Sequence, residues 1–75
     1  MLGMKKETFT VTGMTCGHCE ARVNKAVADL DGVARVDASA ANDSVEVTLR
    51  RGAALDRDTI AKTIQEAGYL VADAP

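Results

Sequence analysis

The sequence contains no tryptophan and few other aromatic residues. Phe9 and Tyr69 are its only phenylalanine and tyrosine, so a hydrophobic core must be built mainly from valine, leucine, isoleucine and alanine. A chain of 75 residues forms one small domain. Such a domain buries only about 60–65% of the surface that its unfolded chain exposes. We therefore expect a thin, aliphatic core.

Excess charge of one sign and long apolar runs are also absent. Nine basic residues stand against eleven acidic ones, which gives a formal net charge of −2 at pH 7. The longest basic runs, Lys5-Lys6 and Arg50-Arg51, do not form a patch for nucleic acid. No apolar run approaches the roughly 18 residues of a membrane-spanning helix, and residues 1–6 lack the apolar segment of a signal peptide. We expect a cytoplasmic protein with reduced thiols, no nucleic-acid partner and no membrane insertion.

The chain has only two cysteines, Cys16 and Cys19, and one histidine, His18. All three lie in the stretch Gly13-Met14-Thr15-Cys16-Gly17-His18-Cys19. A structural zinc site needs four ligands in a tetrahedral cage. With no second cysteine pair, the sequence argues against a zinc finger.

The motif lies between a strand-like and a helix-like segment. Residues 8–12 alternate polar and apolar side chains, as a half-buried strand does. After the motif, apolar residues recur at helical spacing: Cys19, Val23, Ala26, Val27 and Leu30. This pattern predicts Cys16 in a loop and Cys19 in the first helical turn, where two thiols can converge on one atom.

That placement favours metal binding by sulfur. The N-terminus of a helix carries a partial positive charge, which stabilises thiolates and lowers their pKa, whereas the carboxylate of Glu20 acts in the opposite direction. We expect a net lowering of the pKa of at least one of the two thiols. Two soft thiolates suit Cu(I), which accepts as few as two ligands.

The remaining pattern predicts a small α+β domain. Strands are expected at about 7–12 and 33–40, across Val45–Arg50 and at 69–72, and Asn42-Asp43 forms a turn between the second and third. The order βαββαβ is ferredoxin-like, with a four-stranded antiparallel sheet and two helices on one face. The domain is expected to cover residues 7–72, with tails at 1–6 and 73–75, and Met4 is an alternative start to Met1.

Two helices are expected between these strands. The first covers about residues 17–30 and ends before Asp31-Gly32. The second begins after Asp56, which can cap it, with Leu55 and Ile60 forming a hydrophobic staple. Gly68 ends the second helix.

Three stretches together resemble the heavy-metal-associated domain, and most closely the small bacterial cytosolic copper chaperones. They are the motif Gly13–Cys19, Leu30-Asp31-Gly32-Val33, and Ala67-Gly68-Tyr69 before the last strand. The resemblance implies that Cys16 and Cys19 hold Cu(I). Domains of this kind that handle Zn(II) or Cd(II) often carry an acidic residue before the first cysteine. Here that residue is Thr15, so the resemblance favours copper.

Three further residues support the site. The family's buried methionine corresponds to Met14, which we expect to pack beneath the loop rather than to bind copper. The residue that closes over the loop corresponds to Tyr69. His18 projects about 100° around the helix axis from Cys19, so we expect it to face water or a partner. An imidazolium there favours thiolates without binding the metal.

The resemblance implies a carrier and not an enzyme. Two-coordinate Cu(I) leaves an open flank, so an incoming thiolate of a copper-transporting P-type ATPase can exchange with an original ligand. Whether copper bridges two chains into a homodimer stays open. Alternatives are an N-terminal domain of such an ATPase, a mercury-binding relative, or a thiol-disulfide oxidoreductase. Cys-Gly-His-Cys is also the active-site sequence of protein disulfide isomerases, which otherwise differ from this chain.

Overall fold

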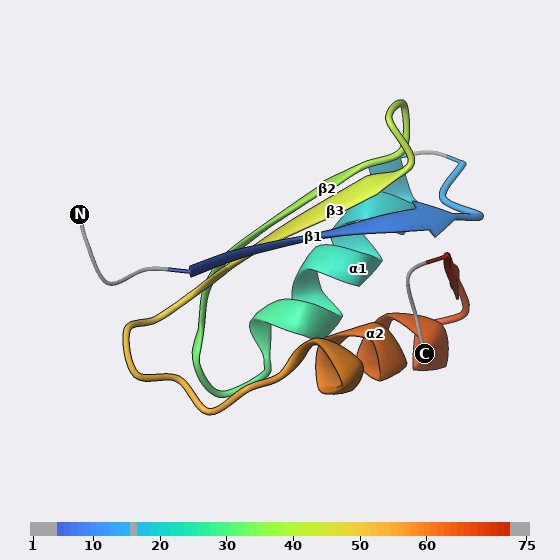
Figure 1. Ribbon diagram of the computed structural model, residues 1–75. Coiled ribbons are helices and arrows are strands. Elements are labelled where there is room, and N and C mark those ends of the chain that lie inside the picture. The colour runs from blue at the N-terminus through green and yellow to red at the C-terminus, as the bar shows by residue number, and fades with distance from the viewer. Residues whose placement is uncertain (1–4, 16, 73–75) are drawn as a thin grey trace.

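The computed structural model describes residues 5–15 and 17–72. The elements are β1 (Lys5–Thr12), α1 (Gly17–Ala28), β2 (Val33–Ser39), β3 (Ser44–Leu49), α2 (Arg57–Glu66) and β4 (Leu70–Val71). The strands form one antiparallel sheet in the order β2-β3-β1-β4. Both helices lie on one face of this sheet (Figure 1). The ferredoxin-like βαββαβ fold predicted from the sequence is therefore confirmed.

The core lies between the sheet and the helices. Alternate residues of β1 and β3 point into it, so Phe9 and Val11 are buried whereas Thr8, Thr10 and Thr12 are exposed. The helices contribute aliphatic side chains to the same cluster: Val23 and Val27 from α1, and Ile60, Ala61 and Ile64 from α2. The core is mainly aliphatic, and its other members are Phe9, Met14 and Tyr69, as the scarcity of aromatic residues predicts.

The pairing of β2 with β3 contains an irregularity that could not be predicted from the sequence. Val33 pairs with Leu49, whereas Arg35 pairs with the next residue along, Thr48. The extra residue in β2 shifts the side-chain alternation by one position, as a β-bulge does. Val33 is buried and Val36 also packs against the core, although residues an odd number apart face opposite sides of a regular strand.

Element ends differ from the predicted ones by a few residues. β1 begins at Lys5, in what we expected to be a tail, because Lys5 and Lys6 pair with Leu49 and Thr48 of β3. α1 ends at Ala28 and not near Leu30. β4 covers only Leu70–Val71 of the predicted 69–72. The other residues of the predicted tails, 1–4 and 73–75, lie outside the described residues.

The start of α2 follows its sequence signals. Asp56 caps the helix, and its carboxylate accepts a hydrogen bond of 2.9 Å from the Thr59 amide. Hydrogen bonding to Thr59 lowers the pKa of the Asp56 carboxyl. Leu55 and Ile60, which flank the cap, both pack into the core, as a hydrophobic staple requires.

The loops gather at two opposite ends of the molecule (Figure 1). The loop 13–15 and the turn between β2 and β3 lie at one end. The loops 29–32 and 50–56 lie at the other, where the Arg50 amide donates to the Gly32 carbonyl at 2.7 Å. Within the described ranges, neither helix has the length and apolar character needed to cross a bilayer.

Candidate metal centre

The loop between β1 and α1 begins with a turn that requires glycine. Gly13 has φ of +98°, in the left-handed region that side chains rarely adopt. A Cβ atom added to Gly13 would lie 3.6 Å from Cδ1 of Tyr69. Gly13 therefore reverses the chain directly against the Tyr69 ring, and Thr15 follows it toward the helix.

Cys19 lies in the first turn of α1, as the sequence predicts. It is half-buried and packs against the core. Its Sγ lies 3.9 Å from Oγ1 of Thr15, within reach of a weak sulfur hydrogen bond. The other predicted ligand, Cys16, lies outside the described residues, so its loop position stays a prediction.

Tyr69 contacts the thiol of Cys19. A hydrogen bond with Cys19, and then burial, raise the pKa of the Tyr69 phenol, whereas the nearby Arg22 guanidinium acts in the opposite direction. The Tyr69 side chain is only 8% exposed. The structure thus brings Tyr69 and Cys19 together from opposite ends of the chain.

The two remaining supporting residues lie on different sides of the loop. Met14 is buried in the core beneath it, which agrees with the predicted packing role. His18 is exposed on α1, so its side chain faces away from the core, as we expected. Among residues 5–15 and 17–72, no three histidine, cysteine, aspartate or glutamate side chains converge as a metal-binding group.

Two contacts near Cys19 were missed from the sequence. Arg22 lies close to the Tyr69 phenol. Glu20, which we considered only as a charge, accepts a hydrogen bond from the Ala40 amide. The helical spacing of Glu20 and Asn24 places two polar side chains on one face of α1, and this spacing was the available signal. Their strand partners depend on the tertiary fold.

The comparisons with known proteins agree on one family. The model of the heavy-metal-associated domain matches residues 8–69. The copper chaperone CopZ of Staphylococcus aureus is 41% identical over 44 residues, which cover 59% of this chain and 65% of CopZ. The chain therefore spans slightly less than two thirds of the length of the curated relatives that it matches.

Solved structures of similar proteins cover most of the chain. A CopZ metallochaperone superimposes with a TM-score of 0.83 at 31% identity, over 89% of this chain and 98% of that one. The water-soluble region of the P-type ATPase CopA from Bacillus subtilis gives a TM-score of 0.81 at 32% identity. That match covers 95% of this chain and 47% of the CopA region.

Proposed function

The chain belongs to the heavy-metal-associated domain family, and from this membership we propose that it carries Cu(I) and is not an enzyme. Cys16 and Cys19 are the proposed ligands. The observation that carries the proposal is the Cys19 thiol, which is half-buried in the first turn of α1 beside the Tyr69 phenol. The similarity to copper chaperones supports copper as the metal.

The chemistry of the donor set favours a soft monovalent ion. The positive end of α1 stabilises a thiolate at Cys19. Thiolates are soft ligands that select Cu(I) over hard cations. Two sulfurs fill two coordination positions, so a third sulfur can approach the metal from outside. We propose that Met14 supports the loop by packing, and that Tyr69 and His18 flank the metal without binding it.

Transfer follows from the open coordination position. A thiolate of the partner binds the copper, a three-coordinate intermediate forms, and one original cysteine then leaves. No naked ion is released, so exchange is rapid even where binding is tight. We propose that this chain works in the cytoplasm and that the acceptor is a copper-transporting P-type ATPase, which the similarity to the soluble region of CopA supports.

The test is anaerobic titration with Cu(I) against a competing chelator. The parent should bind one Cu(I) per chain, and Cys16→Ser or Cys19→Ser should each lower the affinity by orders of magnitude, because a neutral hydroxyl replaces a soft anion. Ala21→Ser, at an exposed site of α1, adds a hydroxyl without removing a thiol and should bind like the parent. A serine variant at either cysteine that competes as well as the parent would contradict the proposal.

A second candidate is a metal-binding domain within a P-type ATPase. The favouring observation is the match to CopA, in which nearly all of this chain corresponds to less than half of the CopA region. The complete coding sequence distinguishes the two, because an ATPase would continue into membrane-spanning segments. A thiol-disulfide oxidoreductase, by contrast, would reduce insulin without metal, and we expect no such activity.

A further inference from the structure

Two side chains of α1 reach the outer edge of the sheet. Oε2 of Glu20 accepts a hydrogen bond of 2.7 Å from the Ala40 amide, and Oδ1 of Asn24 accepts one of 3.0 Å from the Ala38 amide. The strand order places β2 at an edge of the sheet; Ala38 belongs to β2, and Ala40 lies in the turn that follows it. Glu20 and Asn24 lie one helical turn apart on the same face of α1. Together they fasten α1 along β2.

The turn that Glu20 holds also contacts β1. The Ala40 carbonyl accepts a hydrogen bond of 3.4 Å from the Asp43 amide, and the Asp43 carbonyl accepts one of 2.8 Å from Val11. Val11 lies near the end of β1, just before the metal loop. Figure 1 shows the turn between β2 and β3 at the same end of the molecule as this loop. The turn 40–43 is therefore bonded to both elements that flank the loop.

We infer that Glu20 is a positioning residue for the Cys19 thiol, an inference that rests on the proposed Cu(I) function. Glu20 directly follows Cys19 in the first turn of α1. First turns fray because their leading N–H groups have no partner within the helix. The hydrogen bond from Ala40 anchors the first turn of α1 to the chain turn 40–43. The bond between Val11 and Asp43 anchors β1 to this same chain turn. The separation of the two ends of the loop is thereby fixed.

A fixed separation helps the loop to bind a metal. Ordering a flexible ligand set costs free energy at the moment of binding, and a set held in place beforehand avoids that cost. Asn24 makes the same kind of bond one turn further from Cys19, so it contributes to stability without holding the turn that carries the sulfur. The structure therefore contains a matched control.

Three substitutions of Glu20 separate the effect of its hydrogen bond to Ala40 from the effect of its charge. Glu20→Gln removes the charge but keeps an oxygen that can accept from Ala40. Glu20→Asp keeps the charge but is too short to reach, and Glu20→Ala loses both. We expect Glu20→Asp and Glu20→Ala to weaken Cu(I) binding about 10-fold, as loss of a supporting hydrogen bond does at metal sites. Glu20→Gln should bind within about 3-fold of the parent, since about 0.7 kcal/mol or less would then be lost.

The readouts are chelator competition for Cu(I) and amide hydrogen exchange in the metal-free protein. Exchange of the Ala40 amide should accelerate in Glu20→Asp and Glu20→Ala but not in Glu20→Gln. Asn24→Ala should accelerate exchange at the Ala38 amide and lower the unfolding temperature about as much as Glu20→Ala does. It should leave the Cu(I) affinity near that of the parent. If Glu20→Ala does not fold, Glu20→Asp provides the same comparison with the carboxylate retained.

The outcomes distinguish this inference from the proposed function. A parent that binds no Cu(I) would overturn the proposed function and this inference with it. A parent that binds, together with a Glu20→Asp variant that binds equally well, would overturn the inference alone. Equal losses in Glu20→Asp and Asn24→Ala would do the same, since they would show a general effect of stability. So would a Glu20→Gln variant that binds as poorly as Glu20→Ala.

Discussion

The phenol of Tyr69 and the thiol of Cys19 lie close enough at the metal end of the molecule for the thiol to raise the pKa of the phenol. The edge of the same aromatic ring lies against Gly13, where a Cβ atom would be 3.6 Å from Cδ1. Tyr69 thus contacts the loop where it leaves β1 and the helix where the loop ends. A side chain at residue 13 would make only an ordinary van der Waals contact with this ring, so it is the φ of +98° that requires glycine there.

The first prediction concerns the acidity of Tyr69. It is the only tyrosine in the chain, so its near-ultraviolet tyrosinate absorbance reports one group. The hydrogen bond with Cys19 raises the pKa of the Tyr69 phenol above its ordinary value of 10.0. Cys19→Ala should move this pKa back toward 10.0, because it removes both the hydrogen bond and the thiolate charge. An unchanged titration curve in Cys19→Ala would contradict the contact.

The same shift has a consequence for stability at alkaline pH. A raised pKa means that the folded state favours the neutral phenol. The contribution of this phenol to folding stability is therefore fully present below the pKa that it has in the unfolded chain. That contribution is lost as pH rises through the folded value. The metal-free protein should therefore lose stability as pH rises above about 10. Tyr69→Phe keeps the ring against Gly13 and should lose this part of the alkaline decline.

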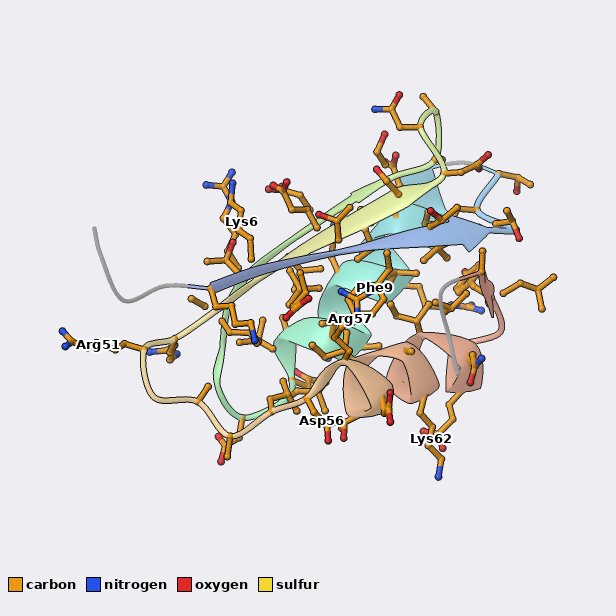
Figure 2. The ribbon with its side chains drawn as sticks, viewed as in Figure 1. Lys6, Phe9, Arg51, Asp56, Arg57 and Lys62 are labelled. Atoms are coloured by element: carbon orange, nitrogen blue, oxygen red, sulfur yellow. The ribbon has the colours of Figure 1, made fainter. Side chains whose placement is uncertain are left out.

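The second prediction concerns acid. Arg57 at the start of α2 bonds to the Glu7 carboxylate and to the Thr8 carbonyl of β1. Its guanidinium carbon lies 4.4 Å from the centroid of the Phe9 ring, and Figure 2 shows Arg57 beside Phe9 between helix and strand. The hydrogen bond from Arg57, followed by the contacts of Lys5, lowers the pKa of Glu7 below 4.5. The folded state therefore favours the ionised carboxylate, whose contribution to stability is present above the unfolded pKa.

That contribution should disappear as pH falls through the depressed pKa of Glu7. We expect Glu7→Gln to cost about 1 kcal/mol near neutral pH, because solvent screens the half-exposed Arg57, and to flatten the decline in stability below about pH 4.5. Glu46→Gln is the control, since Glu46 pairs with Lys6 at 3.4 Å and both side chains are far more exposed than that of Glu7. Thermal unfolding measured across this pH range checks both variants. If the stability of the parent and of Glu7→Gln fell in parallel as pH decreases, the ion pair between Glu7 and Arg57 would not contribute as proposed.

Features with a local cause could be predicted from the sequence. The alternation in β1, the cap at Asp56 and the staple of Leu55 and Ile60 each depend on residues within one element. Their positions were therefore correct. The first-turn position of Cys19 follows from the same kind of local periodicity.

Features that depend on distant partners could not be predicted in this way. Arg57 has no local signal that directs it to Glu7, which is a neighbour only because α2 packs under β1. The bulge near Arg35 exists because both Val33 and Val36 pack against the core. Glu20 shows the difference most clearly at the site. Its charge is visible in the sequence, whereas its hydrogen bond from the Ala40 amide forms only when the turn after β2 lies beside α1 in the folded protein.

The third prediction tests the aliphatic core. Ile64 is fully buried among the residues of the core cluster, so Ile64→Ala should cost about 2–5 kcal/mol and Ile64→Val about 0.5–1.5 kcal/mol. Leu70 is 72% exposed, and Leu70→Ala should change stability by less than about 0.5 kcal/mol. Urea unfolding measures all three. Similar losses for Ile64→Ala and Leu70→Ala would contradict the burial of Ile64.

The last prediction concerns His18, which lies between the two cysteines in sequence but not on the side of the core in space. Its side chain is exposed on α1, whereas Cys19 packs against the core. Cu(I) that already has two thiolates gains little from a nitrogen ligand. His18→Ala should therefore still bind one Cu(I) per chain, with an affinity loss within about 10-fold.

The measurement is the same chelator competition, with Cys16→Ser as the reference for loss of a true ligand. X-ray absorption of the copper-loaded monomer should show sulfur neighbours and no nitrogen at bonding distance. His18 is free to act elsewhere, because an exposed imidazole on the first turn of α1 faces whatever protein approaches the metal. Transfer to a partner should then slow in His18→Ala even where affinity is nearly unchanged. A loss of affinity as large as that of Cys16→Ser would instead make His18 a ligand.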